Sequence, residues 1–155
     1  MAGEEQWFEP MRLAMAEAAI AADESGDVPV GAVLVSPDGQ IVALGRNEKE
    51  LNNDPTAHAE IVAIRKAAAD RSDWRLENLT LVVTLEPCAM CAGAIVAARI
   101  PRVVFGAWDE RVGASGSLYD LIRDARLGRP AEVIPGVLEP ECSAQLKEFF
   151  QSKRA

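Results

Sequence analysis

Two short motifs, far apart along the chain, contain the residues that most constrain how this sequence can fold. The only histidine lies in His58-Ala59-Glu60, and two of the three cysteines lie in Pro87-Cys88-Ala89-Met90-Cys91. On a helix, Cys88 and Cys91 are about one turn apart and share a face, so both thiolates can bind one metal ion. Imidazole and thiolate are ligands that zinc prefers. We therefore expect a fold that brings His58 next to Cys88 and Cys91 around one zinc ion.

Three ligands of this kind are typical of a catalytic zinc rather than a structural one, because they leave the fourth tetrahedral position open to water. Zinc lowers the pKa of bound water to about 7, and a carboxylate outside the ligand set can accept its proton. Glu60 is placed for that task, since His58 and Glu60 lie where a helix begins and can face one pocket. We expect Glu60 to be the catalytic acid and base.

Two simpler interpretations of these residues remain open from the pattern alone. A redox role for Cys88 and Cys91 would leave His58 and Glu60 unexplained. A structural zinc would need a fourth ligand, for which Cys142 is the only other cysteine. We expect Cys142 instead to be a buried core residue on the apolar side of the closing helix, near Leu146 and Phe149.

Hydrophobic periodicity and turn residues predict elements in the order αββαβαβαβα. Helices are expected over Trp7–Glu24, Pro55–Asp70, Cys88–Ala98, Leu118–Ala125 and Glu139–Lys153, and strands over Val28–Val35, Ile41–Gly45, Thr80–Thr84, Val103–Phe105 and Val133–Ile134. The last strand is expected at an edge of the sheet. Strands that alternate with helices after one hairpin predict an α/β fold, a three-layer α/β/α sandwich around a mixed, mostly parallel five-stranded sheet.

Length and composition indicate one soluble domain over residues 1–155, since 49% of the residues are hydrophobic and no stretch is long enough to span a membrane. The acidic start MAGEEQWFEP lacks the basic region of a secretory signal, so we expect a cytoplasmic protein with reduced cysteines. The net charge of -8 excludes broad nonspecific nucleic-acid binding. An RNA substrate would need a local basic patch, for which the candidates are Arg123, Arg126, Arg129, Lys147, Lys153 and Arg154.

The two metal-ligand motifs together resemble those of zinc-dependent nucleobase deaminases, in which the glutamate is the acid and base and not a ligand. Over most of its length the sequence resembles the bacterial tRNA-specific adenosine deaminases. The similar segments are Val28–Val33, Gly45–Asn47, Asp54–Ile61, Thr84–Ala94, Arg102–Ala107, Gly113–Leu118 and Glu148–Phe150. The last three segments resemble the tRNA-editing branch rather than cytidine deaminases.

This resemblance implies a cytidine deaminase-like fold and hydrolytic deamination of the wobble adenosine to inosine in tRNA, with arginine tRNA as the expected substrate. It implies one Zn²⁺ per subunit and a homodimer that binds the anticodon loop near the subunit boundary. The residues that it implies for substrate binding are Val30, Asn47, Ala59, Pro87 and Asp109. An alternative for Asn47 is that it caps a loop. A helix that contains Met90, Ala94 and Ile95 is a candidate dimer interface, or packs on the sheet.

Two features depart from the pattern of that family. Trp108 stands where the family often has a smaller or charged residue, and Arg126–Ala131 lacks the usual Asn-His-Arg pattern. Two rival functions are compatible with the motifs. One is a guanine or cytosine deaminase that acts on a free nucleobase or nucleoside, which the acidic composition would suit. The other is a non-catalytic zinc-binding RNA module.

Overall fold

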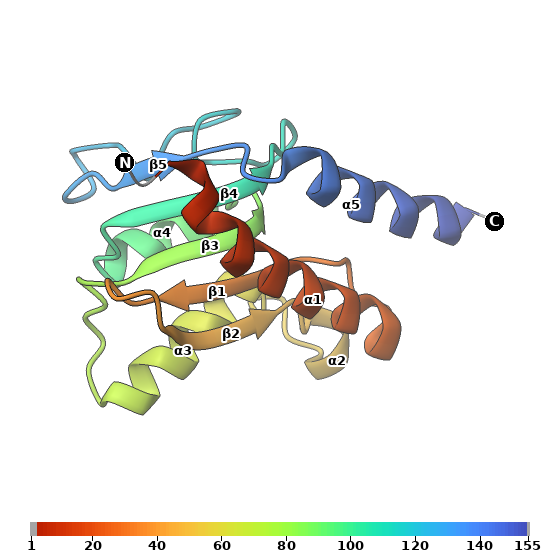
Figure 1. The fold of residues 1–155 in the computed structure, drawn as a ribbon, viewed down its shortest axis with the longest axis horizontal. Helices are drawn as coiled ribbons and strands as arrows, with labels where there is room; N and C mark the ends of the chain where they lie inside the picture. Colours follow the sequence, from red (N-terminus) through yellow and green to blue (C-terminus); the bar gives the residue numbers. More distant parts are fainter. Residues whose placement is uncertain (1–2, 155) are drawn as a thin grey trace.

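A five-stranded sheet forms the centre of the protein in a computed structural model that describes residues 3–154 (Figure 1). The strands are β1 (Gly31–Val35), β2 (Ile41–Arg46), β3 (Thr80–Leu85), β4 (Arg102–Ala107) and β5 (Glu132–Ile134), in the spatial order β2-β1-β3-β4-β5. β1 pairs antiparallel with β2 and β3, whereas β4 pairs parallel with β3 and β5. All strands except β1 therefore run in one direction, and β5 is an edge strand as predicted.

Helices cover both faces of the sheet and complete the predicted three layers (Figure 1). α1 (Phe8–Ser25), which follows a 3₁₀ turn at Glu4–Trp7, and α5 (Glu139–Arg154) lie on one face. α3 (Ala59–Arg71) and α4 (Ala89–Ala97) lie on the other face. A four-residue helix, α2 (Lys49–Asn52), lies within the polar loop that follows β2 and was not predicted. The α/β sandwich inferred from the sequence is confirmed.

The central strands are buried on both faces, which explains their nearly continuous apolar sequence. In β3, Leu81 and Val83 belong to the core under α3 and α4, whereas Val82 belongs to the core under α1 and α5. Val103 and Val104 of β4 divide in the same way, because successive side chains of a strand point to opposite faces. This sheet therefore provides a fixed base for the loops at its ends.

The helix predicted over Leu118–Ala125 is wrong, because this segment forms turns and an isolated bridge between Ser115 and Asp120. Its first N–H groups are bonded to the preceding loop instead of within a helical turn. The N–H of Leu121 donates to the carbonyl of Ala114, at 2.9 Å, and the N–H of Leu118 donates to the carbonyl of Gly113, at 3.2 Å. Loop contacts have replaced the bonds of a helical turn, which the apolar spacing alone could not indicate.

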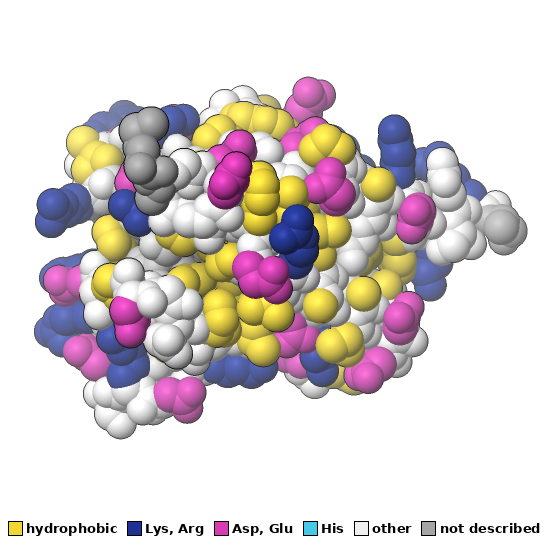
Figure 2. Space-filling model, in the orientation of Figure 1, with side chains coloured by type: hydrophobic (Ala, Val, Ile, Leu, Met, Phe, Trp, Pro, Cys, Tyr) yellow, Lys and Arg dark blue, Asp and Glu magenta, His cyan; other side chains and the backbone are white. Residues whose placement is uncertain are grey.

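The face that α1 and α5 cover has hydrophobic side chains at its centre, with acidic and basic side chains interspersed around its margin (Figure 2). No broad area of a single sign of charge appears on this face. Within residues 3–154, no helix is both long enough and apolar enough to cross a lipid bilayer.

Candidate metal centre and its pocket

The first residues of two helices bring the metal-ligand motifs together. His58 is the N-cap of α3, and Cys88 is the N-cap of α4, immediately after β3. Both residues were predicted inside their helices. Each instead has extended backbone dihedrals and immediately precedes the first residue of its helix. Cys91 lies in the first turn of α4, where its buried side chain points back toward Cys88. Because α3 and α4 lie on one face of the sheet, the two helix starts meet at one end of that face.

Three potential ligand atoms lie close enough to bind one ion. The Nδ1 atom of His58 is 3.6 Å from the Sγ atom of Cys88 and 3.4 Å from the Sγ atom of Cys91. All three ligand atoms lie within 4.8 Å of one another. One imidazole nitrogen and two sulfurs form a donor set that fits zinc and leaves a tetrahedral position for substrate or water. Cys142 is buried in the other core, on the far side of the sheet, so the structure confirms it as a core residue.

Hydrogen bonds among the three side chains favour the thiolate form of Cys88. A hydrogen bond from Cys91, followed by one from His58, lowers the pKa of Cys88 to about 4. The hydrogen bond to Cys88 raises the pKa of His58 and, together with burial, that of Cys91. Thiolate is the form of cysteine that binds metals. The positive ends of α3 and α4 further favour anionic groups at this place.

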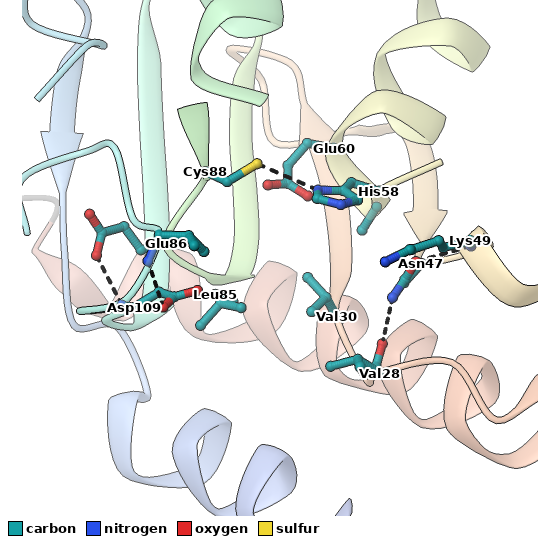
Figure 3. Close-up of a pocket in the computed structure, with 12 residues that line it drawn as sticks. Val28, Val30, Asn47, Lys49, His58, Glu60, Leu85, Glu86, Cys88 and Asp109 are labelled. Carbon is teal, nitrogen blue, oxygen red and sulfur yellow. Dashed lines mark hydrogen bonds between the residues drawn. The ribbon is translucent and has the colours of Figure 1, made fainter. Parts of the chain in front are cut away.

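Glu60 lies beside this cluster in the first turn of α3 and is only 3% exposed. Burial raises the pKa of its carboxyl above the ordinary value. A carboxyl group whose charged form is disfavoured takes up a proton more readily, which suits a general acid and base. The Glu60 side chain also lines the same pocket as His58 and Cys88 (Figure 3).

The pocket next to the cluster has a volume of about 190 Å³ (Figure 3). Four of the predicted substrate-binding residues line it, namely Val30, Asn47, Ala59 and Asp109. Pro87 does not line this pocket, and its carbonyl accepts a hydrogen bond from the N–H of Ala114 at 2.8 Å. The sequence did not single out the other lining residues, Val28, Lys49, Leu85, Glu86 and Val112.

Asn47 caps a loop, which is one of the two roles predicted for it, and it also lies at the pocket. Its Oδ1 atom accepts a hydrogen bond from the N–H of Lys49 at 3.1 Å, and its Nδ2 atom donates to the carbonyl of Val28 at 3.2 Å (Figure 3). The side chain therefore caps the loop after β2. It also lies in the pocket wall, where its amide can offer a further hydrogen bond to a ligand.

Glu86 is a buried carboxylate that sequence reasoning missed. It is 2% exposed and accepts hydrogen bonds from the backbone N–H groups of Asp109, Ser115 and Ser117, each at 3.0 Å, and from the hydroxyl of Ser117 at 2.6 Å. These bonds fold the loop of residues 109–117 around the end of β3 and fix Asp109 at the pocket. The sequence did contain a signal for Glu86, because an acidic residue directly after a buried apolar strand must be hydrogen-bonded if it is buried as well.

Trp108 precedes Asp109 and is 44% exposed. Its ring makes an edge-to-face contact with buried Phe105, with 4.9 Å between the ring centroids.

Two of the candidate basic residues have acidic partners, since Arg123 pairs with Asp120 at 2.8 Å and Arg126 pairs with Asp124 at 2.7 Å. These ion pairs reduce the positive charge that the two arginines can offer to RNA.

Comparison with known proteins places this geometry among deaminases. Residues 4–107 match the model of the cytidine and deoxycytidylate deaminase zinc-binding region. The tRNA-specific adenosine deaminase of Bacillus subtilis is 49% identical over 133 residues, which cover 86% of this chain and 82% of that protein.

Two solved structures are similar as well. A tRNA:A34 deaminase that carries out A-to-I editing at the wobble position of transfer RNA has a TM-score of 0.83 and 42% identity, covering 88% of this chain and 98% of that one. The guanine deaminase of Bacillus subtilis has a TM-score of 0.63 and 39% identity, covering 70% of this chain and 66% of that one.

Proposed function

Because the chain belongs to the tRNA-specific adenosine deaminases, within the zinc-binding cytidine and deoxycytidylate deaminase family, we propose that it deaminates the wobble adenosine of tRNA, arginine tRNA foremost, to inosine. The observation that carries this proposal is the meeting of His58, Cys88 and Cys91 next to the buried Glu60, at a pocket that His58, Cys88 and Glu60 line. These side chains supply what hydrolysis of an amidine requires, a metal site and a proton carrier in a partly enclosed space.

His58, Cys88 and Cys91 are the proposed ligands of one zinc ion per chain, which when bound would activate water at neutral pH. Glu60 takes the proton from the attacking water and delivers it to the ring nitrogen beside the reacting carbon. The water oxygen becomes bonded to that carbon, which bears the exocyclic amine. Glu60 then takes the proton of the new hydroxyl group and gives it to the amine. The carbon–nitrogen bond breaks as the carbon–oxygen double bond forms, and ammonia leaves with inosine as the product.

The residues of the pocket wall are suited to binding a nucleobase. Val30 offers an apolar surface to a ring face, and the Asn47 amide offers hydrogen-bonding groups to the substrate. Asp109, fixed through Glu86, is proposed to lie beside the flanking nucleotides. Reaching the reactive carbon requires an unstacked base, and a tRNA anticodon loop already presents such bases.

We also propose that the protein is a cytoplasmic homodimer. Large apolar side chains remain exposed on the loop beside the pocket, among them Val112, Leu118 and Tyr119. Such a group of exposed apolar residues favours burial against a partner. Met90 of α4 is partly exposed, but Ile95 packs in the core, so α4 offers only part of its apolar surface to an interface. Light scattering should give about twice the chain mass of 16.7 kDa.

A guanine deaminase is the second candidate, because a guanine deaminase shares the fold and 39% of the aligned residues. The deciding experiment incubates the protein with the anticodon stem-loop of an arginine tRNA that has adenosine at the first anticodon position. We expect inosine at that position, which sequencing reads as guanosine. Ammonia release from guanine or cytosine, without inosine in the stem-loop, would favour the second candidate.

A further inference from the structure

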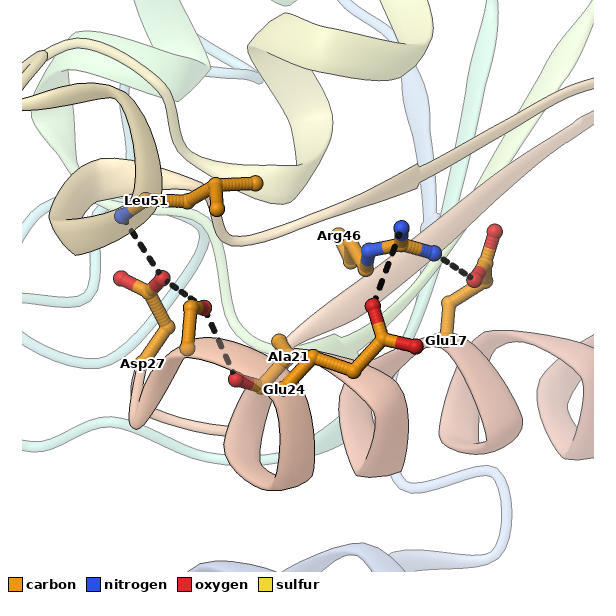
Figure 4. Close-up of polar contacts among 7 residues, drawn as sticks. Glu17, Ala21, Glu24, Asp27, Arg46 and Leu51 are labelled. Atoms are coloured by element: carbon orange, nitrogen blue, oxygen red, sulfur yellow. Dashed lines mark hydrogen bonds and ion pairs between the residues drawn. The ribbon is translucent and has the colours of Figure 1, made fainter.

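The wall of the pocket opposite Asp109 is formed in part by residues 46–51, which we call the wall segment (Figure 3). It begins with Arg46, the last residue of β2, and includes Asn47 and most of α2. Two polar contacts attach this segment to the second half of α1 and to the residues that follow it (Figure 4). In the first, Arg46 pairs with Glu17 at 3.0 Å and with Glu24 at 3.9 Å.

The second contact depends on Asp27, which is 1% exposed. Its carboxylate accepts hydrogen bonds from the N–H of Glu50 at 2.6 Å and from the hydroxyl of Ser25 at 2.5 Å. It also accepts one from the N–H of Leu51 at 3.2 Å (Figure 4). The N-cap of α2, Glu48, makes no capping bond with its own side chain. Asp27 therefore satisfies N–H groups that a helix start leaves without partners. A helix of four residues is not stable by itself, so its position depends on this external carboxylate.

Lys49, the first residue of α2, is the only lysine or arginine among the described residues that line the pocket. Within residues 3–154, no carboxylate lies within 4.0 Å of its ammonium group, in contrast to the paired Arg46. The Lys49 side chain is exposed and lies beside Asn47, on the side of the pocket opposite Asp109 (Figure 3). An unpaired cation at the rim of a pocket in an acidic protein favours an anionic part of the ligand at that place.

We propose that Lys49 binds a phosphate of the RNA strand next to the target nucleoside, and that Asp27 positions Lys49 through α2. This proposal rests on the proposed function, because the phosphate belongs to the RNA that enters the pocket. A base in the pocket leaves its ribose and flanking phosphates at the rim, where Lys49 lies. Asp27 is thus a positioning residue, which acts on the substrate through the wall segment.

Salt dependence provides a readout that a loss of folding would not produce. Each phosphate contact to single-stranded nucleic acid contributes about 0.7 to the slope of log affinity against log salt concentration. We expect Lys49→Gln to reduce that slope by about this amount and to raise KM for the stem-loop several-fold at low salt. Zinc content and kcat at saturating stem-loop should not change, because Lys49 is not expected to touch the reacting atoms.

Lys66→Gln is the matched control. Lys66 is an exposed lysine of α3 whose ammonium donates to the carbonyl of Leu44, at 3.1 Å, and it does not line the pocket. Both substitutions remove one positive charge from the chain, so Lys66→Gln controls for the change in net charge. The slope and KM of Lys66→Gln should match those of the unmodified protein. Equal values for Lys49→Gln and Lys66→Gln would overturn the proposed phosphate contact.

A double-mutant cycle tests the positioning role. In Asp27→Asn, an NH₂ group must replace one carboxylate oxygen and face an N–H donor of α2, so we expect a rise in KM similar to that of Lys49→Gln. Adding Lys49→Gln to Asp27→Asn should then cost little more. Asp23→Asn is the control, since Asp23 is an exposed residue of α1 four positions before Asp27, and this substitution should leave KM unchanged. Fully additive losses would show that Asp27 does not act through Lys49.

The experiment separates this contact from the proposed chemistry. Affinity for a fluorescent stem-loop is measured by anisotropy over a range of salt concentrations, in parallel with inosine formation. Binding whose salt slope depends on Lys49, without any inosine, would support the contact and overturn the proposed reaction. Inosine formation with a salt slope that is unchanged in Lys49→Gln would support the reaction and overturn the contact.

Discussion

At the scale of single residues, a buried carboxylate lowers the stability of the folded chain, so its presence beside metal ligands indicates a functional role. Glu60 is almost fully buried, and burial raises the pKa of its carboxyl. If packing were the only role of this position, an apolar residue would give a more stable folded state. Its place beside His58 and Cys88 in the pocket matches the task of a proton carrier.

Glu60→Gln keeps the size of the side chain and removes its capacity to exchange a proton. We expect stoichiometric zinc and unchanged stem-loop binding, with kcat lower by a factor of about 10²–10⁴ or more. Metal analysis and a single-turnover inosine assay measure the two quantities separately. Unchanged turnover would remove Glu60 from the mechanism.

Cys88→Ala removes a proposed ligand, so we expect the purified variant to contain much less zinc. Cys142→Ala is the matched control, because Cys142 is a buried thiol on the other face of the sheet and should leave the zinc content unchanged. Metal analysis of both variants requires no substrate. Equal zinc in the two variants would contradict the assignment of Cys88.

The residues with recognisable metal chemistry were predictable from the sequence, whereas the partners of residues that act through backbone contacts were not. His58, Cys88 and Cys91 have few alternative uses as a set, and the structure brings them together. Asp27 and Glu86 bond mainly to backbone N–H groups of segments distant in sequence. Any residue type can offer such an N–H group, so no side-chain pattern marks these partners.

At the scale of elements, the loop of residues 109–117 shows how one carboxylate can organise an irregular segment. The Glu86 carboxylate accepts hydrogen bonds from three backbone N–H groups and one hydroxyl group. Gly113 packs so closely that a Cβ atom there would lie 2.4 Å from Glu86 and from the carbonyl of Asp109. The loop therefore has one compact arrangement, with Asp109 and Val112 at the pocket.

Glu86→Gln has nearly the same shape but places an NH₂ group opposite N–H donors in either orientation of its amide. Since a buried donor without a partner costs about 1–3 kcal/mol, we expect a loss of stability of that order and a raised KM for the stem-loop. Denaturant unfolding and steady-state kinetics measure the two effects. Glu132→Gln, at an exposed ion pair with Arg102, should cost at most about 1 kcal/mol. Similar small losses in both variants would show that Glu86 does not hold the loop.

Elements with a strong apolar pattern were predicted well, and those held by long-range contacts were not. The β-branched runs of β3 and β4 gave the right strands because both faces of these strands are buried. Leu118–Ala125 has the spacing of a helix, but the N–H groups of Leu118 and Leu121 bond to the carbonyls of the loop before it. α2 is too short to show periodicity and depends on Asp27 from another part of the chain.

At the scale of the whole molecule, the sheet brings distant motifs to one place. β2 and β3 run in the same direction, so the connections that follow them, to α3 and α4, start from the same end of the sheet. The predicted order of strands and helices was sufficient to infer this layered fold. The position of β1 between β2 and β3 was not predictable, because alternation of elements does not specify which strands pair.

Zinc bound at this place would link the starts of α3 and α4, so metal binding should stabilise the folded chain. A ligand present at about 1,000 times its dissociation constant adds about 4 kcal/mol, which for a chain of this size raises Tm by on the order of 10 °C. Calorimetry before and after treatment with a chelator should show a loss of that order, reversed by added zinc. Cys88→Ala should not respond to the chelator. A Tm that is the same with and without zinc would contradict the link.

X-ray absorption at the zinc edge is the most direct test of the central claim, that His58, Cys88 and Cys91 hold one zinc with a place left for water. The account predicts one zinc per chain, with two sulfur neighbours at about 2.3 Å and two nitrogen or oxygen neighbours at about 2.0–2.1 Å. Four sulfur neighbours, no sulfur neighbours, or fully active protein without metal would contradict it.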